Sequence, residues 1–267
     1  MLKVIEGTRA SLFPMEMDAM FRNRAAVFSE RLGWEVVVKD GRERDVFDDE
    51  NPVYLVSVDP CTGKYWGSLR LLPTTGPNML RDVFPFLLRK DEFIESATIW
   101  ETSRICAVAA DGQPERSKSG VNLALGELLA GIGEVAIIAG LTQIVSVFDA
   151  RIFRVLRAAG CNPQIIGKPR RIGDTMSYAG LFDTGEGPLQ SIRDAVGILH
   201  HMLQPFSANK INLTRIESRP LKGRPWEYVF FLDFLGHRME RRVARALTQL
   251  NGLCQMLKVL GSYPVWR

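Results

Sequence analysis

The sequence of 267 residues holds only three histidines and four cysteines, and charged residues interrupt every long apolar run. Cys61, Cys106, Cys161 and Cys254 lie far apart and form no CxxC pair, so neither a zinc ribbon nor a disulfide framework is indicated. The first ten residues, MLKVIEGTRA, lack the apolar segment of a secretory signal peptide. We therefore expect a cytoplasmic protein that neither crosses a membrane nor holds a metal ion.

The three histidines (His200, His201 and His237) all fall after residue 187. Any proton transfer within residues 1–187 must therefore use a carboxylate, a water or another group. The net charge of +4 is also uneven: residues 188–267 carry twelve Lys and Arg against five Asp and Glu, and residues 1–187 carry 22 against 25. This shift predicts two modules, 1–187 and 188–267, divided at the segment TGEGP (184–188).

The first module alternates strand and helix patterns, which predicts an α/β (α+β) fold. Strands are expected at 3–6, 54–58, 65–71, 99–108, 144–148 and 175–182, and helices at 15–32, 123–139 and 151–159. The segment 41–52 is polar and acidic and is expected to be a loop. Arg24 lies on the apolar stripe of the first helix, between Phe21 and Phe28, so its charge needs a partner or a ligand.

The second module predicts a ferredoxin-like β-α-β-β-α-β order. Helices are expected at 196–206 and 239–250, and strands at 211–217, 226–234 and 256–260. The short segment 189–192 would supply the first strand.

Several residues of the first module have the order and near-family spacing of one enzyme family. They are Arg24, Phe28, Trp34, Asp45, Asp48, Arg70, Phe84, Glu101 and Arg104, together with the specific stretch RLLPTTGPNMLRDVFP (70–85). In these residues the chain resembles the LuxI family of acyl-homoserine-lactone synthases, from its N-terminus to about residue 187. The resemblance implies a three-layer acyltransferase fold like that of GCN5-related N-acetyltransferases (GNAT), with a V-shaped opening in the sheet for a thioester donor.

The same resemblance implies two substrates and no cofactor. S-adenosylmethionine (SAM) would supply the amine, and an acyl carrier protein would carry the acyl thioester. The amine attacks the thioester, and the carboxylate of SAM then displaces methylthioadenosine to close the lactone. A rival interpretation is another acyltransferase of this fold that uses acyl-CoA and a different amine.

The matching residues suit these tasks by their chemistry. Asp45 and Asp48 offer acceptors to the cationic sulfonium and amine, and Phe28 and Trp34 offer aromatic faces. Three arginines can pair with the substrate carboxylate and with those acids: Arg24, Arg70 and Arg104. The alternative is that these Arg and Asp residues form a structural ion-pair network that orders the N-terminal loop.

The run WETSR (100–104) supplies the remaining catalytic candidates. Glu101, acting through a water, is the candidate base for the amine, and Ser103 with neighbouring strand-edge amides can hold the acyl carbonyl. Phe84 completes the set of substrate-binding residues that the resemblance implies. Thr142 resembles the threonine of family members that prefer 3-oxoacyl donors, although threonine is also an ordinary strand residue.

Basic residues gather after the predicted strand 144–148. Arg151, Arg154 and Arg157 share one helix face, and Lys168, Arg170 and Arg171 follow. Because an acyl carrier protein is acidic, Arg151, Arg154 and Lys168 are candidates for its docking surface. The alternative is an ordinary solvated basic face. Nucleic acid is not an expected partner, because no nucleic-acid-binding motif accompanies the charge.

The tail resembles the ACT domain that regulates prephenate dehydratases, through the run ESRP (217–220) and the glycine loop VGIL (196–199). This resemblance implies that phenylalanine binds between the two motifs across a homodimer interface, with Gly197, Glu217, Ser218 and Arg219 as ligand residues. The dehydratase catalytic domain is absent, so only ligand binding and dimerisation carry over. Two alternatives stay open: a tail that only dimerises, and a non-enzymatic amino-acid sensor.

Overall fold

The computed structural model describes residues 1–59, 62–90, 92–108, 122–196, 203, 205–221, 224–252, 254 and 256–263. The chain forms two compact units. The first, here called the synthase unit, comprises Leu2–Asp59 and Gly63–Val196, and the second, the tail unit, is formed mainly by Gly197–Arg267. No helix in the described part of the chain is long and apolar enough to cross a membrane.

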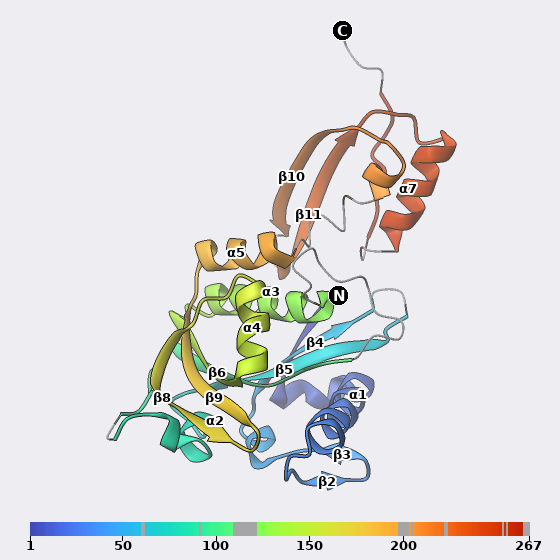
Figure 1. Cartoon of the computed structure of the whole chain (residues 1–267). Helices are drawn as coiled ribbons and strands as arrows, with labels where there is room; N and C mark the ends of the chain where they lie inside the picture. Colours follow the sequence, from blue (N-terminus) through green and yellow to red (C-terminus); the bar gives the residue numbers. More distant parts are fainter. Residues whose placement is uncertain are drawn as a thin grey trace. The chain divides into compact units, whose positions relative to one another are not determined.

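The synthase unit is built on one seven-stranded sheet with the order β1-β4-β5-β6-β7-β9-β8 (Figure 1). All neighbouring strands are antiparallel except β6 and β7. The strands are β1 (Leu2–Glu6), β4 (Val53–Val58), β5 (Tyr65–Pro73), β6 (Ile99–Ala107), β7 (Gln143–Asp149), β8 (Gln164–Ile172) and β9 (Thr175–Asp183).

The sheet opens between β6 and β7. The two strands pair only from Ile99–Thr102 to Gln143–Ser146. Beyond that point β6 continues against β5, and β7 continues against β9. The V-shaped opening expected from the sequence is therefore confirmed, with the pair Thr102–Ser146 at its apex.

Helices cover both faces of this sheet. Helix α1 (Pro14–Arg24) packs on β5 and β6, whereas α3 (Leu123–Ile138) packs on β1, β4 and β5 from the other side. Alternate residues of β5 face the two helices, since side chains of a strand point to opposite faces. Arg70 reaches the network at the end of α1. On the other face, a Cβ on Gly67 would lie 3.2 Å from Leu128 of α3. Helix α4 (Ala150–Ala158) follows β7 directly, and α5 (Glu186–Val196) packs on α3.

The first helix is not regular to its end. The sequence predicts one helix over 15–32, but α1 stops at Arg24 and continues as the π-helical segment η2 (Ala25–Arg31). Its wider turns bring the N–H of Leu32 to the carbonyl of Val27, at 3.0 Å. Such π turns concentrate at functional sites, and this one lies between Arg24 and Trp34.

Short elements complete the synthase unit. They are η1 (Gly7–Leu12), β2 (Val38–Lys39), β3 (Arg42–Glu43), η3 (Val46–Asp49), α2 (Met79–Asp82) and η4 (Pro85–Leu87). The expected loop over 41–52 thus contains β3 and η3. A capping box closes the turn η3: the Asp45 side chain accepts the backbone N–H of Asp48, and the Asp48 side chain accepts the backbone N–H of Asp45.

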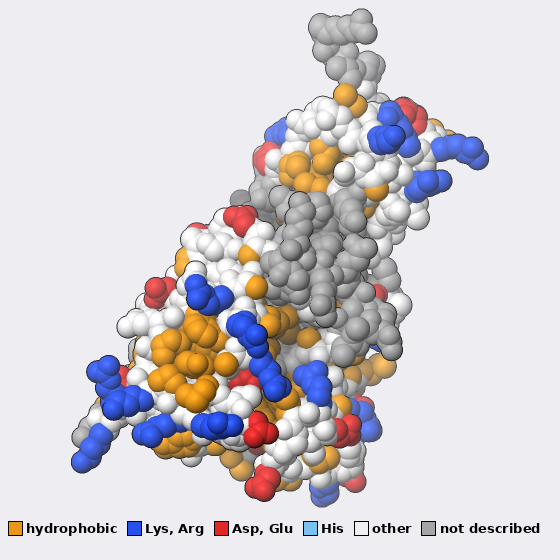
Figure 2. Space-filling model, in the orientation of Figure 1, with side chains coloured by type: hydrophobic (Ala, Val, Ile, Leu, Met, Phe, Trp, Pro, Cys, Tyr) orange, Lys and Arg blue, Asp and Glu red, His pale blue; other side chains and the backbone are white. Residues whose placement is uncertain are grey.

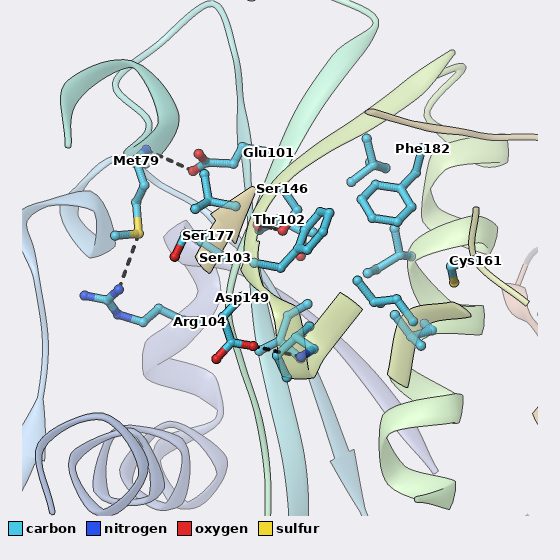
Figure 3. A pocket seen from close by; sticks show the side chains of 18 of the residues that line it. Met79, Glu101, Thr102, Ser103, Arg104, Ser146, Asp149, Cys161, Ser177 and Phe182 are labelled. Carbon is cyan, nitrogen blue, oxygen red and sulfur yellow. Dashed lines mark hydrogen bonds between the residues drawn. The ribbon is translucent and has the colours of Figure 1, made fainter. Parts of the chain in front are cut away.

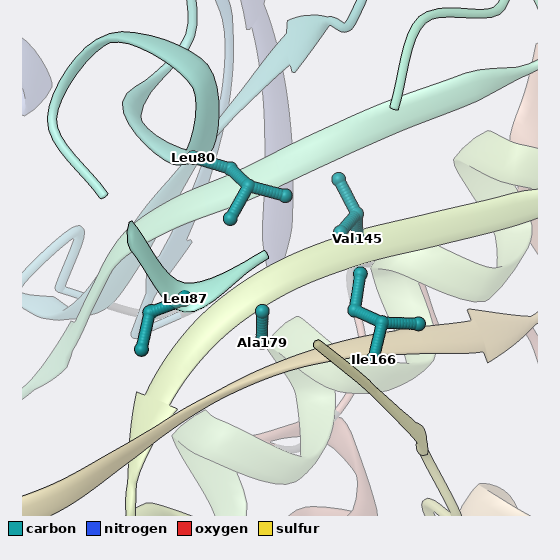
Figure 4. Packing of buried hydrophobic residues seen from close by; sticks show 5 residues of the cluster. All are labelled: Leu80, Leu87, Val145, Ile166 and Ala179. Atoms are coloured by element: carbon teal, nitrogen blue, oxygen red, sulfur yellow. The ribbon is translucent and has the colours of Figure 1, made fainter. Parts of the chain in front are cut away.

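A hydrophobic cluster holds α2 and η4 against the sheet. Leu80, Leu87, Val145, Ile166 and Ala179 come from five different elements and are all buried (Figure 4). The cluster includes β8, a strand that the sequence analysis missed. It fixes the segment that follows β5 beside β6.

One further expectation at the end of the synthase unit is wrong. Leu189–Ile192 form no strand but lie within α5. The segment 184–188, at which the sequence divides the two modules, leads into α5, which begins at Glu186. Leu189 is buried, and its side chain packs over Gly133 of α3, 3.1 Å from the position that a Cβ would take there.

The tail unit contains the hairpin β10 (Leu213–Leu221) and β11 (Arg224–Phe234), followed by α7 (Arg241–Asn251). Its core joins Phe206 and Ile211 to Val243, Ala246 and Leu250 of α7. These strands and this helix match the expected ones within a few residues. The expected last strand over 256–260 is irregular instead.

Candidate active site

Three arginines and three acids form one buried, charge-balanced network beside the end of α1. Arg24 ends α1, Arg70 lies on β5 and Arg104 on β6. The acids come from the segment between α1 and β4: Glu43, Asp45 and Asp48. Arg24, Glu43 and Arg70 are almost completely buried. Burying so much charge is tolerable only because each group is paired.

Arg24 is the centre of this network. Its two terminal nitrogens donate to the two carboxylate oxygens of Asp48, both at 2.9 Å, and its Nε donates to Glu43. The partner that the sequence required for a charge on this apolar stripe is therefore confirmed. The Arg24 guanidinium also lies 5.2 Å from the ring of Phe21.

The acceptors of Asp48 are fully used within the protein. One oxygen accepts from Arg24, Arg70 and the Tyr54 hydroxyl, and the other accepts from Arg24 and the Asp45 N–H. Burial acts to raise the pKa of this carboxyl, but the hydrogen bonds and charge of Arg24 and the charge of Arg70 lower it well below its usual range. Asp48 therefore stays ionised and orders the loop.

Asp45 is more accessible than Asp48. Arg70 donates to both of its oxygens, and Arg104 lies 2.8 Å away. Its side chain keeps 18% of its surface exposed, whereas that of Asp48 keeps none. Of the two predicted acids, Asp45 is thus the one that can still meet a ligand.

Glu43 is the site residue that the sequence analysis missed. It is completely buried, and its carboxylate accepts a hydrogen bond from Arg24. Two nitrogens of the Arg104 guanidinium also donate to it, at 3.0 and 3.2 Å. The available signal was the charge count, because three expected arginines against two expected aspartates leave one positive charge without a partner.

Arg104 has an unusual backbone. Its φ is 54°, in the left-handed region that few residues other than glycine adopt. The pairing of β5 with β6 shifts here, from Arg70–Ser103 to Ser68–Cys106, so Arg104 lies in a β-bulge. The bulge turns the guanidinium toward Glu43 and Asp45, and it lies 5.1 Å from the ring of Phe28.

Two aromatic rings stand next to this network. Phe28 lies in the π-helical segment and stacks on Trp34, with ring centroids 5.2 Å apart. Phe28 is buried and Trp34 is exposed. A cationic or aromatic ligand can therefore reach the pair from solvent.

A cavity of about 1120 Å³ connects these features through the opening of the sheet (Figure 3). At one end it is lined by Phe28, Trp34, Glu101 and Arg104. At the other end it is mostly apolar, with walls from α3, α4 and α5: Leu129, Ile132, Gly133, Leu156, Leu189 and Ile192. One polar end and one long apolar chamber suit a charged group and an acyl chain in a single site.

Glu101 forms part of the cavity wall and is almost fully buried. Its two oxygens accept the N–H groups of Met79 and Leu80, at 2.9 and 2.6 Å, which ties α2 to β6. Burial raises the pKa of Glu101 to about 7, against the opposing effect of these two hydrogen bonds. A carboxyl with a pKa near neutrality can both take and release a proton at cellular pH.

The other predicted residues divide into those at the cavity and those away from it. Ser103 and Phe84 line the cavity, and Ser103 accepts from the Nε of Arg70 at 3.2 Å. Thr142 lies elsewhere: it is exposed, does not line the cavity, and its hydroxyl pairs with that of Thr98 at 3.0 Å. The geometry therefore gives the 3-oxoacyl interpretation of Thr142 no support, because the residue precedes the paired part of β7.

The predicted basic residues are exposed and lie on α4 and β8. Arg151 borders the cavity, while Arg154, Lys168, Arg170 and Arg171 lie outside it. Asp149, the last residue of β7, caps α4 by accepting the N–H groups of Arg151 and Ile152 at 2.9 and 2.8 Å. The cap fixes α4 at the edge of the opening.

The structure describes only some of the predicted ligand residues of the tail. Gly197 lies outside the described residues. Glu217, Ser218 and Arg219 follow one another on β10, and the Glu217 carboxylate pairs with Arg215 on the same strand.

Comparison with known proteins matches each unit to one family. The family model described as autoinducer synthase matches residues 11–192, and the ACT domain model matches residues 189–252. The acyl-homoserine-lactone synthase of Rhizobium etli is 36% identical over 210 residues, which cover 78% of this chain and 96% of that protein.

The tail has a different set of relatives. Over 76 residues the chain is 51% identical to the bifunctional chorismate mutase/prephenate dehydratase of Aquifex aeolicus. The match covers 28% of this chain and 21% of that enzyme.

Solved structures agree with the assignment of the synthase unit. BjaI, a CoA-dependent acyl-homoserine lactone synthase solved with SAM and isopentyl-CoA, is similar with a TM-score of 0.64 at 27% identity, over 74% of this chain and 89% of that one. The synthase LasI gives 0.62 at 26% identity, over 73% and 93%. The expected fold class is confirmed. The chain is an acyltransferase enzyme that belongs to the acyl-homoserine-lactone (autoinducer) synthase family, and it carries an ACT domain after its synthase unit.

Proposed function

We propose that this enzyme transfers an acyl group from a thioester to the amine of SAM and then closes the product to an N-acyl-homoserine lactone, releasing methylthioadenosine. SAM is a substrate in this proposal, and the reaction takes place in the cytoplasm. The observation that carries the proposal is the single cavity that joins the charged network to an apolar chamber through the opening between β6 and β7.

The polar end of the cavity suits SAM. Phe28 and Trp34 offer aromatic faces to the sulfonium and the adenine, and the exposed edge of Asp45 offers an acceptor to the amine. Arg104 lies between them and can pair with the carboxylate. Arg24, Arg70 and Asp48 support this end of the cavity indirectly: they are buried and hold Asp45 and Arg104 in place.

Glu101 acts as the base in this proposal. The amine of SAM loses a proton when it attacks the thioester carbon, and Glu101 takes it through a water. The carbonyl oxygen gains negative charge at the same time, and Ser103 with the unpaired edge of β6 stabilises it. The thiol of the donor then leaves. The carboxylate of the bound product attacks its own Cγ and displaces methylthioadenosine.

The test is direct. The purified full chain is incubated with SAM and acyl thioesters, and lactone and methylthioadenosine are followed by mass spectrometry. A Glu101→Gln variant is expected to lose most turnover, whereas Glu95→Gln, which alters an exposed acid of the same segment, is not. With the wild type, kcat/KM is expected to rise with pH through about 7, since only ionised Glu101 accepts the proton. Turnover that survives Glu101→Gln would contradict this role.

For the acyl donor we propose an acyl carrier protein. Figure 2 shows Lys and Arg side chains around an apolar area over α4, β8 and β9. Arg151 borders the cavity, and Arg154 and Lys168 lie on the same elements, α4 and β8, where an acidic carrier would dock to deliver its thioester. BjaI, which is CoA-dependent, makes acyl-CoA the alternative.

Charge reversal separates these donors. Arg154→Glu with Lys168→Glu is expected to lower kcat/KM for the carrier-bound donor at least tenfold at low salt, with less effect at high salt. The same acyl group on uncharged pantetheine serves as the control and is expected to react unchanged. Equal activity of wild type and variant with the carrier would refute the docking surface.

For the tail unit we propose phenylalanine binding and homodimer formation, with Gly197, Glu217, Ser218 and Arg219 at the ligand. The identity to prephenate dehydratases over 76 residues supports this proposal. Titration with phenylalanine is expected to raise the melting temperature and to alter turnover, with leucine as the control. A tail that only dimerises would give a dimer by light scattering and no response to either amino acid.

A further inference from the structure

Helix α5 forms one wall of the apolar chamber. Leu189 and Ile192 line the cavity from this helix, together with side chains of α3 and α4. Leu189 is buried and Ile192 is half-buried, whereas Gln190 is exposed and does not line the cavity. The room that an acyl chain finds at this end of the cavity therefore depends on the position of α5.

Two glycines allow α5 to approach its neighbours closely. A Cβ on Gly133 of α3 would lie 3.1 Å from the side chain of Leu189. A Cβ on Gly160, which follows α4, would lie 2.6 Å from the carbonyl oxygen of Ser191. The helix therefore lies against bare backbone on two sides, and both glycines also line the cavity.

Few buried side chains hold α5 in this position. The helix packs on α3 (Figure 1), and Arg193 pairs with Glu134 of α3 at 2.6 Å. Of the α5 side chains that the structure describes, only Leu189 is buried. Elements with few buried apolar contacts are displaced at a lower cost in free energy than core elements. A shift of α5 therefore leaves the core of the sheet intact.

The same helix leads directly into the tail unit. It ends at Val196, and the tail unit begins at Gly197. The synthase family model ends at residue 192 and the ACT domain model starts at residue 189, so both models match residues 189–192. These four residues include both chamber side chains, Leu189 and Ile192. One continuous segment thus belongs to the chamber wall and to the start of the ACT match.

We propose that α5 couples the tail unit to the acyl chamber, so that an aromatic amino acid bound by the tail changes the length of acyl chain that the enzyme accepts. The inference rests on the functions proposed above for the two units. A ligand acts at a distance when it favours one position of an element that a second site also contacts, and here that element is α5. The SAM end of the cavity is lined by Phe28 and Trp34 and not by α5, so SAM binding stays independent of the tail.

The first experiment measures kcat/KM of the full chain for saturated acyl thioesters of increasing length, with and without phenylalanine. Phenylalanine is expected to change the ratio of kcat/KM between long and short donors about tenfold, because one methylene group against an apolar wall alters kcat/KM roughly 10–200-fold. The KM for SAM is expected to stay unchanged. If bound phenylalanine has no effect, acts equally on all donors, or acts on the KM for SAM alone, the proposal is overturned.

A linker variant tests whether the effect passes through α5. A flexible glycine–serine linker inserted after Val196 separates the tail from α5 and leaves both units in the chain. This variant is expected to keep its turnover and its affinity for phenylalanine but to lose the phenylalanine response. Without phenylalanine its long donors are expected to gain relative to its short donors, since the tail no longer holds α5. A response that persists in the linker variant would contradict the coupling.

Substitutions on α5 test the wall itself. Ile192→Ala and Leu189→Val enlarge the chamber and are expected to raise kcat/KM for long donors relative to short ones. Gln190→Ala is the matched control, since Gln190 is an exposed residue of the same helix that does not line the cavity. If neither wall variant changes the length preference, α5 does not limit the acyl chain and the proposal fails.

Binding separates a failure of this inference from a failure of the proposed functions. By linkage, a non-reactive long-chain acyl pantetheine amide must change the affinity for phenylalanine by the same factor by which phenylalanine changes the affinity for the amide. Calorimetry measures both factors without turnover, so it decides the coupling even if no lactone forms. If phenylalanine does not bind, the proposed ligand of the tail is wrong and the linker variant decides the coupling. An unchanged preference for long over short chains in that variant would then overturn it.

Discussion

Replacing Glu43 with glutamine tests the charge balance of the buried network. Glu43→Gln keeps the size of the side chain but leaves three arginines facing two acids. The side chains of Arg24 and Arg104 are 1% and 8% exposed, so water cannot stabilise the excess charge. Breaking a buried ion pair by removing one partner lowers the free energy of unfolding by about 3–5 kcal/mol. That loss is a large part of the ~5–15 kcal/mol that holds an ordinary domain folded.

The measurement must report the synthase unit alone, because a chain of two units need not unfold in one step. Trp34, Trp66 and Trp100 lie in the synthase unit, and the other two tryptophans, Trp226 and Trp266, lie after residue 196. In a background with Trp226→Phe and Trp266→Phe, urea unfolding followed by fluorescence therefore reports the synthase unit.

The matched control is Asp49→Asn, an acid from the same segment. Asp49 pairs with Arg44 at 2.5 Å, but the two side chains are 69% and 58% exposed. Surface pairs of this kind contribute about 0–1 kcal/mol. A second variant, Glu43→Gln with Arg104→Gln, restores two arginines to two acids and is expected to destabilise less than the sum of its parts. The reasoning is refuted if Glu43→Gln lowers the unfolding free energy by less than about 1 kcal/mol, or if the double variant is additive.

Three further predictions follow from single contacts. Burial raises the pKa of Glu101 from its ordinary 4.5 to about 7 in the folded protein. Protonated Glu101 therefore favours the folded state, and the free energy of unfolding falls by up to about 3 kcal/mol as pH rises from 4.5 through 7. Urea unfolding at pH 5 and pH 8 is expected to show a smaller pH dependence for Glu101→Gln than for the wild type. Gly167→Ala is expected to destabilise the synthase unit far more than Gly173→Ala. Both glycines have a positive φ, but only at Gly167 would the added Cβ collide with a carbonyl oxygen, that of Leu87. Leu189→Ala is expected to destabilise the synthase unit by about 2–5 kcal/mol, since Leu189 is buried against α3; an unchanged fluorescence transition would mean that α5 does not belong to that unit.

Local patterns predicted much of the synthase unit because its core elements bury one clear face. Strands β4, β5, β6, β7 and β9 were located within a few residues. The need for a partner at Arg24 also came from a local pattern, a charge on an apolar stripe. These features depend on neighbours in sequence, so they can be read without knowing the fold.

The missed features depend on distant neighbours. Strand β8 carries Lys168, Arg170 and Arg171, so it does not alternate like a half-buried strand and gives only a basic signal. Residues 189–192 (LQSI) form too short a segment to distinguish strand from helix by periodicity, and packing on α3 decides for the helix α5. Glu43 stands among arginines in sequence, and only the fold shows that its partners come from α1 and β6.

The bulge at Arg104 explains how one strand serves both the network and the cavity. In a regular strand Arg104 would share a face with Thr102, away from Arg70 and Ser103. The register shift places two residues of β6 opposite Leu69 and lets the guanidinium join Glu43 and Asp45 beside Ser103. Glycine would adopt a φ of 54° without the roughly 1–2 kcal/mol penalty of another residue. An arginine in this position therefore indicates that its ion pairs offset the strain. The strained backbone places a positive charge at the point where the network meets the cavity.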